Sequence, residues 1–167
     1  MDHPRSIPAT FAFATPPRVL IVESRFHTDI ADLLLTGARA VLERVRATVE
    51  VVTVPGALEI PAAILFADQG AKGGYDCYVA LGCVIRGATQ HDTIVGGESA
   101  RGLQVLALER GLAIGNGILT CATQAQALDR ADPAHFDRGG AAAEACLRLL
   151  EIKQRLSGVT ALPSRVG

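Results

Sequence analysis

A short polar segment, residues 86–92, holds the residue types that acid–base chemistry on an anionic substrate requires. Its sequence is RGATQHD. Arg86 carries a permanent positive charge, and His91 carries an imidazole, the side chain best suited to proton transfer near neutral pH. Gly87 and the small residues after it let a ligand approach the backbone closely. The segment predicts an anion-binding, proton-transferring loop, with an ordinary surface loop bearing an exposed histidine as the alternative.

The flanking segments place this loop at a strand-to-helix junction. The nearly all-apolar run 75–85 predicts a strand covered on both faces, and residues 93–109 predict a helix. Unpaired N–H groups and the positive end of the helix dipole then face the loop. Phosphate is a common ligand at such a helix N-terminus. The loop is therefore the first candidate for contact with a phosphate group.

Two other predicted strands also end in candidate residues. Phe26 follows the strand 18–23, where an aromatic ring either stacks on a flat ligand or plugs the edge of the core. Glu59 belongs to the segment VPGALEI, residues 54–60, after the strand 48–54. There it either bonds a ligand or simply favours the dipole of the following helix. On the pattern alone, both interpretations of each residue stay open.

Arg130 and three of the four cysteines are expected to have structural roles on the local sequence alone. Arg130 is expected to be an exposed cation at a helix end. No cysteine belongs to a CxxC pair, which argues against a zinc site. Cys77, Cys83 and Cys121 lie in apolar, strand-like runs, and we expect them to be reduced core residues of a cytosolic protein. A catalytic Cys83 stays open as an alternative, although no base stands beside it in the sequence.

Apolar runs and amphipathic stretches alternate along the chain, which predicts a parallel sheet with right-handed crossovers. The predicted strands cover 18–23, 48–54, 75–85 and 113–120, and the predicted helices cover 28–46, a stretch after Gly56 through 62–68, 93–109, 123–131 and 139–156. The expected fold is α/β: a three-layer α/β/α sandwich with a four-stranded parallel sheet, flavodoxin-like. Ligands of such sheets bind beyond the carboxyl ends of the strands, where the candidates of residues 86–92, Phe26 and Glu59 lie.

Length and composition predict a single domain between two tails. The chain has 167 residues, of which 18–157 form the expected domain. Residues 1–17 hold four prolines and no helical period, so we expect an extended or partly disordered tail, and residues 158–167 form a short C-terminal tail. A net charge of −1 gives no basic field for nucleic acid. The apolar runs are too short for a membrane span and no secretory signal pattern opens the chain, so we expect a cytoplasmic protein.

Several motifs together resemble one family, the lumazine synthases, across residues 18–156. They are Arg25-Phe26, VPGALEI at 54–60, GCVIRGATQHD at 82–92, IGNGILT at 114–120 and ALDRA at 127–131. The resemblance implies the condensation of 5-amino-6-(ribitylamino)uracil with 3,4-dihydroxy-2-butanone 4-phosphate. The product is 6,7-dimethyl-8-ribityllumazine, the other products are phosphate and water, and the resemblance implies no metal and no other cofactor.

The resemblance also implies a role for each matching residue, with His91 as the proton donor and acceptor. The residues that it implies for contact with the pyrimidine and the ribityl chain are Phe26, Ala57, Leu58, Glu59, Cys83, Val84, Ile85 and Asn116. Contacts with the phosphate fall to Gly87, Ala88, Thr89 and Arg130, with Arg86 and Arg138 as further candidates. Asn116 and Arg130 would come from a neighbouring subunit, so a homo-oligomer is implied, either a pentamer or an assembly of pentamers with its active sites at subunit interfaces.

Some positions depart from the family pattern. Arg138 stands where many members have lysine, Ala122-Thr123 replaces an acidic residue and an asparagine, and Ala141 replaces an acidic residue. These departures keep two alternatives open: a non-catalytic module that binds a lumazine or a flavin, and a mainly structural shell protein. A flavodoxin-like FMN redox protein fits the expected fold but not the motifs.

Overall fold

A computed structural model describes residues 10–70 and 74–158, and its four strands form one parallel sheet in the order β2-β1-β3-β4. The sheet confirms the predicted α/β fold. The elements are β1 (Arg18–Ser24), α1 (Thr28–Arg44), β2 (Thr48–Val54), the 3₁₀ turn η1 (Ala57–Glu59), α2 (Ile60–Gly70), β3 (Cys77–Ile85), α3 (His91–Arg110), β4 (Ile114–Cys121), α4 (Gln124–Ala131) and α5 (Arg138–Leu156).

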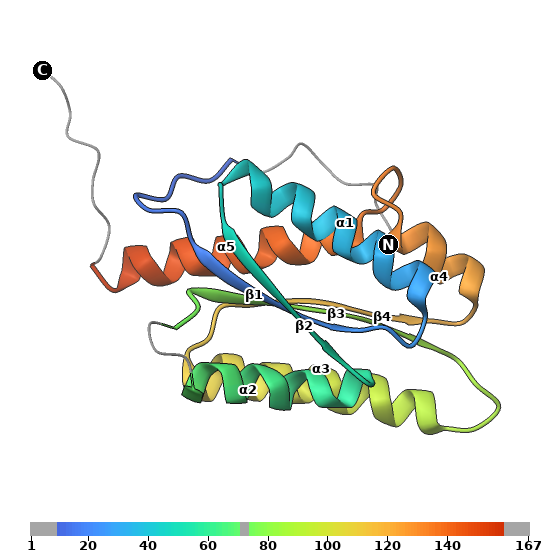
Figure 1. Cartoon of the computed structure of the whole chain (residues 1–167). Coiled ribbons are helices and arrows are strands. Elements are labelled where there is room, and N and C mark those ends of the chain that lie inside the picture. The colour runs from blue at the N-terminus through green and yellow to red at the C-terminus, as the bar shows by residue number, and fades with distance from the viewer. Residues whose placement is uncertain (1–9, 71–73, 159–167) are drawn as a thin grey trace, which may run out of the picture.

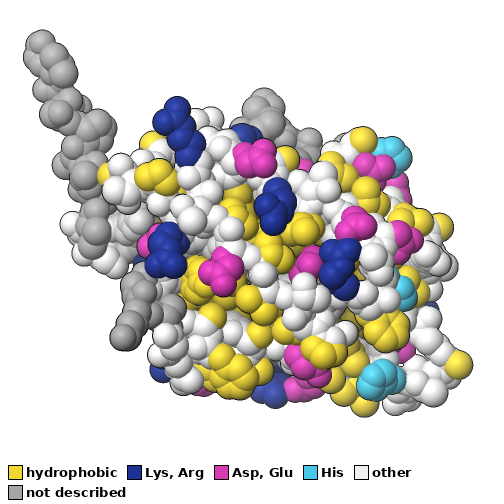
Figure 2. Space-filling view, viewed as in Figure 1, with side chains coloured by type: hydrophobic (Ala, Val, Ile, Leu, Met, Phe, Trp, Pro, Cys, Tyr) yellow, Lys and Arg dark blue, Asp and Glu magenta, His cyan; other side chains and the backbone are white. Residues whose placement is uncertain are grey.

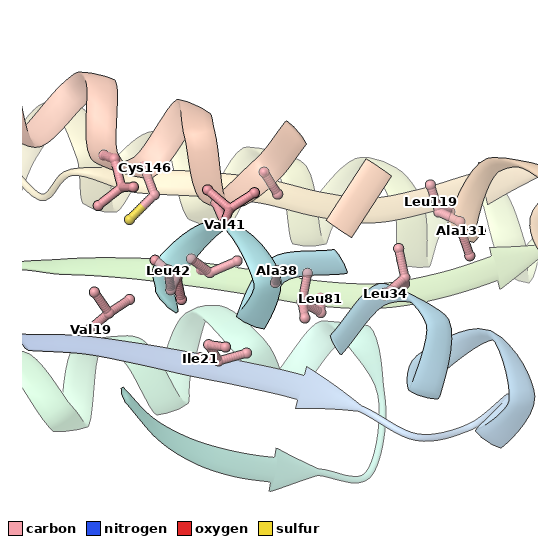
Figure 3. Close-up of a cluster of buried hydrophobic side chains, with 14 of the residues drawn as sticks. Val19, Ile21, Leu34, Ala38, Val41, Leu42, Leu81, Leu119, Ala131 and Cys146 are labelled. Carbon is pink, nitrogen blue, oxygen red and sulfur yellow. The ribbon is translucent and has the colours of Figure 1, made fainter. Parts of the chain in front are cut away.

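Helices cover both faces of the sheet, so the domain has the three predicted layers. Helices α1, α4 and α5 lie on one face, and α2 and α3 lie on the other (Figure 1). Alternate residues of β1 explain this arrangement, because successive side chains of a strand point to opposite faces. Val19 and Ile21 pack with α1 and α5 (Figure 3). Leu20 and Val22 point to the opposite face and pack with α2 and α3.

Glycines allow α5 to lie unusually close to its neighbours. A Cβ at Gly115 of β4 would lie 1.9 Å from the carbonyl oxygen of Ala142. A Cβ at Gly139 would lie 2.0 Å from the carbonyl oxygen of Leu34 in α1. Both obstructing atoms belong to backbone, which cannot rotate away as a side chain can. The position of α5 on β4 and α1 therefore depends on the absence of side chains at these two points.

The predicted helix boundaries need small corrections. Helix α3 begins at His91, two residues before the predicted start at residue 93, because Gln90 rather than a later residue is its N-cap. The segment after Gly56 first forms the turn η1 and becomes α-helical only at Ile60. Helix α1 ends at Arg44 because Arg46 adopts a positive φ of 56°, a conformation that helices do not propagate.

The predicted tails lie largely outside the described residues, namely 1–9 and 159–167. Residues 10–17 form neither helix nor strand. Within this stretch Phe11 and Phe13 lie 6.3 Å apart, stacked, and pack against the core beneath α1 and α5. None of the helices in the described part of the chain is long and apolar enough to cross a membrane.

Candidate active site

A pocket of about 570 Å³ lies where β1, β2 and β3 end. The carboxyl ends of these parallel strands point to the same edge of the sheet (Figure 1). On the face seen in Figure 2, the histidine side chains gather at that end of the molecule. The pocket is lined by Ser24, Phe26, His27, Pro55, Gly56, Ala57, Leu58, Glu59, Cys83, Val84, Ile85, Gly87, Thr89, His91, Asp92 and Val95.

The turn after β1 presents Phe26 to this pocket. The ring is 78 % exposed, which rules out the interpretation that it plugs the core. The imidazole of His27 meets it edge-on, with ring centroids 5.1 Å apart. Such edge-to-face pairs are favourable because the positive ring edge faces the negative ring face. Phe26 is thus an aromatic surface open to a ligand and supported from one side.

An ion-pair network centred on the buried Glu23 fixes the backbone just before Phe26. Glu23, 3 % exposed, accepts hydrogen bonds from Arg25 Nη1 at 3.2 Å and from Thr53 Oγ1 at 3.2 Å. Arg25 Nη2 donates to Asp32 Oδ1 at 2.5 Å. The hydrogen bond to Asp32, followed by that to Glu23, raises the pKa of Arg25. Because β1, β2 and α1 all contribute to this network, it joins the turn to three elements of the frame.

The turn after β2 places one buried and two exposed residues at the pocket. Ala57 is buried, while Leu58 and Glu59 are exposed. A Cβ at Gly56 would lie 2.9 Å from Glu59 Oε2, so the carboxylate lies over the bare backbone of Gly56. Two acceptor oxygens therefore lie at the pocket wall, where they can receive hydrogen bonds from hydroxyl groups of a ligand.

The segment after β3 supplies the glycine and histidine that the sequence singled out. Gly87, Thr89 and His91 line the pocket, but Ala88 is not among its lining residues. A Cβ at Gly87 would meet no atom within 4 Å, so open space adjoins the backbone there. His91 is exposed and is the first residue of α3, whose N-cap, Gln90, makes no side-chain capping bond. The amide donors in the first turn of α3 and the imidazole of His91 therefore lie at the same pocket.

Cys83 lies at the pocket as a protonated thiol. Burial raises its pKa to about 12, with smaller contributions from Cys121 and Asp29. A thiol with such a pKa holds almost no thiolate near neutral pH, and the thiolate is the reactive form. This finding argues against the alternative of a catalytic Cys83. All four cysteines are buried and lie outside any disulfide, as predicted for Cys77, Cys83 and Cys121. Within the described ranges no group of three or more His, Cys, Asp or Glu residues could hold a metal ion.

The remaining predicted residues lie away from this pocket. Asn116 stands exposed on β4, where its Oδ1 accepts a hydrogen bond from the N–H of Ile118 at 2.9 Å. With Arg86 it lines a second pocket of about 550 Å³ between β4 and α3. Arg130 lies in the last turn of α4, and Arg138 is the first residue of α5. Arg130 is half-buried rather than exposed as predicted, because its guanidinium lies over the ring of Phe136.

The two groups of residues differ in charge. In the part of the chain that the structure describes, no arginine or lysine lines the first pocket, whose charged carboxylates are Glu59 and Asp92. The candidate cations Arg86, Arg130 and Arg138 all lie outside it. One chain therefore brings together an aromatic ring, acceptor oxygens and an imidazole, but not the side-chain cations that a phosphate ester would need.

Sequence reasoning missed several residues of the first pocket: Ser24, His27, Pro55, Gly56, Asp92 and Val95. His27 could have been found, because it directly follows Phe26 at a predicted strand end. Asp92 belonged to the segment 86–92 but was given no role. Val95 could not have been found, since a predicted helix that begins at residue 93 does not show that the first turn of α3 forms a wall of the pocket.

An open parallel sheet, covered by helices on both faces and hollowed beyond its carboxyl edge, defines a doubly wound α/β protein that acts on a small molecule. The family model described as 6,7-dimethyl-8-ribityllumazine synthase matches residues 16–154. The chain belongs to this family.

Individual relatives agree over most of their length. The 6,7-dimethyl-8-ribityllumazine synthase of Methylorubrum extorquens is 56 % identical over 156 residues, which are 92 % of this chain and 88 % of the relative. That of Novosphingobium aromaticivorans is 56 % identical over 140 residues, 84 % of this chain and 99 % of the relative. The 6,7-dimethyl-8-ribityllumazine synthase 1 of Rhizobium meliloti is 54 % identical over 144 residues, 84 % of this chain and 94 % of the relative. The similarity thus covers 84–92 % of this chain and 88–99 % of these relatives.

Proposed function

We propose that the chain condenses 5-amino-6-(ribitylamino)uracil with 3,4-dihydroxy-2-butanone 4-phosphate to give 6,7-dimethyl-8-ribityllumazine, phosphate and water, the step that supplies the precursor of riboflavin. The observation that carries the proposal is that one pocket joins Phe26, Glu59 and His91 from three separate strand ends. These side chains match a flat pyrimidine, a polyhydroxyl chain and a reaction made of proton transfers.

The proposed roles follow the position of each residue around the pocket. Phe26 stacks on the pyrimidine and Glu59 accepts hydrogen bonds from the ribityl chain. Further substrate contacts come from Ala57, Leu58, Cys83, Val84 and Ile85, largely through backbone. Gly87, Ala88 and Thr89 hold the phosphate at the start of α3, where amides and the helix dipole favour an anion.

The reaction needs proton transfer at nearly every step. The amine of the pyrimidine attacks the ketone carbonyl, water leaves, and an imine forms. Loss of a proton next to the imine and departure of phosphate give an enol. The enol takes up a proton on its terminal carbon and becomes a ketone, and the second amine attacks this carbonyl and closes the ring as a second water leaves. His91 moves these protons, a contribution typically of ~10²–10⁴-fold. Holding both substrates in one pocket contributes at least as much, because it makes the attack intramolecular.

We further propose that the enzyme is a homopentamer, or an assembly of pentamers, with each active site shared between neighbours. Asn116 and Arg130 would reach the first pocket of the adjacent subunit, and Arg138 and Arg86 are further candidates for the phosphate. The proposal is supported by the lack of arginine and lysine among the described lining residues of that pocket. The edge strand β4 and the second pocket beside it offer a surface for the head-to-tail contact that builds a ring. Four cysteines outside any disulfide fit a cytoplasmic location.

The decisive test supplies both substrates and follows two products. We expect 6,7-dimethyl-8-ribityllumazine, detected by its absorbance after chromatography, and phosphate in equal molar amounts. Phosphate release without the lumazine, or no product at all, would contradict the proposal. Tight binding of a lumazine or flavin without turnover would instead identify the non-catalytic module, and light scattering on the same sample gives the size of the assembly.

A further inference from the structure

The connection between α4 and α5, residues 132–137, is a compact loop held by hydrogen bonds. The carbonyl of Asp132 accepts from the N–H groups of His135 and Asp137, each at 3.0 Å. The Asp132 side chain accepts from the N–H of Ala134 at 2.8 Å through Oδ1. A loop with so many internal bonds presents its side chains in a defined direction.

Asp137 anchors the end of this loop to the core. It is 4 % exposed and has a left-handed φ of 45°. Its Oδ1 caps α5 by accepting from the N–H of Gly140 at 2.9 Å. A Cβ at Gly37 would lie 2.0 Å from that oxygen, so α1 leaves just enough room for the carboxylate. The residues immediately before and after Asp137, namely Phe136 and Arg138, therefore start from a fixed backbone.

Phe136 has a guanidinium near its ring from each side of the loop. The Cζ atoms of Arg130 and Arg138 lie 5.9 and 6.0 Å from the ring centroid. A cation over an aromatic face is attracted by the ring quadrupole. Unlike a carboxylate, a phenyl ring holds a guanidinium without neutralising its charge. Both arginines also make other contacts within the chain, so the ring is one restraint among several.

Two guanidinium groups near one ring form an arrangement that suits a doubly charged anion. Like charges repel, so two long cationic side chains would separate in water unless something holds them. A phosphate monoester stabilises two neighbouring guanidinium groups, because each group can donate two parallel hydrogen bonds to the phosphate oxygens. A ring that keeps both cations in place before the anion arrives reduces the entropy lost on binding.

We propose that Phe136 is a positioning residue that holds Arg130 and Arg138 together as a two-cation site for the phosphate of the butanone substrate in the neighbouring subunit's pocket. This inference rests on the proposed function. Phe136 itself touches neither substrate. Its effect is confined to the phosphate-bearing substrate, because the pyrimidine contacts come from residues of the first pocket.

The test compares Phe136→Leu with the aromatic variant Phe136→Tyr in the full-length assembled enzyme. For Phe136→Leu we expect the KM for the butanone phosphate, and the inhibition constant of inorganic phosphate, to rise roughly five- to tenfold. The KM for the pyrimidine substrate and kcat should stay within about twofold. Phe136→Tyr keeps the ring and should restore both phosphate-dependent constants. Phe66→Leu on α2, where Phe66 is 67 % exposed, is the matched control and should change none of them.

The outcomes separate this inference from the proposed function. A wild-type enzyme that forms no lumazine contradicts the function itself. An active wild-type enzyme whose phosphate-dependent constants are unchanged in Phe136→Leu overturns the role of Phe136. Equal rises in both KM values, or no rescue by tyrosine, would show a merely structural role and also overturn it. If Phe136→Leu does not fold, Phe136→Met gives the same comparison, because the flexible methionine fills irregular gaps without an aromatic face.

Discussion

The pocket at the ends of β1–β3 and the surface formed by β4 and the α4–α5 loop are built in opposite ways. The first gathers its residues from three short turns at one edge of the sheet, and one chain supplies all of its described lining residues. The second consists of side chains that do not line the first pocket of their own chain, such as the exposed Asn116 and the half-buried Arg130.

The difference in charge between the two regions is the more instructive one. In the described part of the chain, acceptors and imidazoles line the first pocket, while the candidate cations belong to the second region. A phosphate ester held by one chain alone would rely on backbone amides. If the regions of two chains meet, cation and amide contacts combine on one phosphate. Catalysis then depends on assembly, and the two regions can be separated by mutation.

Loss of the imidazole should produce the largest effect and tests the first region by itself. We expect His91→Ala to lower kcat by ~10²–10⁴-fold, because every proton transfer then relies on water. The inhibition constant of inorganic phosphate should stay within about threefold of the wild-type value, since the amides and the arginines remain. An unchanged rate of lumazine formation would remove His91 from the mechanism. His135→Ala, which removes an exposed histidine outside this pocket, is the control for histidine loss.

Mixing two defective chains tests whether the regions belong to one site. His91→Ala and Arg130→Ala should each have low activity alone. After co-expression, about a quarter of the interfaces in a randomly mixed ring would join an intact first pocket to an intact Arg130. Activity should therefore recover to about a quarter of the wild-type value. If each chain formed its own site, the mixture would be no more active than the average of the two single variants.

The close backbone packing of α5 on β4 positions the second region. A substitution that disturbs this packing should lower the free energy of unfolding, a smaller effect than the losses of activity above. Gly115→Ala forces a methyl group to within 1.9 Å of the Ala142 carbonyl oxygen, and overpacking of this kind costs about 1–3 kcal/mol. The free energy of unfolding in urea measures this cost. Gly70→Ala is the matched control, because a Cβ there meets nothing within 4 Å. Equal stability of the two variants would show that α5 can move away from β4 at little cost.

The same contrast explains how much the sequence could predict. The sheet, the helices and the first pocket follow from local patterns, because apolar runs define strands and the carboxyl ends of parallel strands share one edge. The start of α3 was misplaced because Gln90 is not one of the usual capping residues. No local signal predicts the closeness of Gly115 to Ala142 or the two guanidinium groups at Phe136, since these contacts join separate elements. The roles of Asn116 and Arg130 came from the family resemblance alone.

Removal of the Cys83 thiol should have the smallest effect, although Cys83 lines the first pocket. Burial raises its pKa to about 12, so the thiol stays protonated throughout the range in which the enzyme is assayed. We expect Cys83→Ala to keep kcat within about threefold, because backbone rather than sulfur contacts the substrate. The pH profile of kcat should show no loss of activity that depends on Cys83 below pH ~10, since a raised pKa moves ionisation to higher pH. A drop of a hundredfold or more in kcat would contradict this prediction. It would support the alternative in which Cys83 is a catalytic nucleophile in the first pocket.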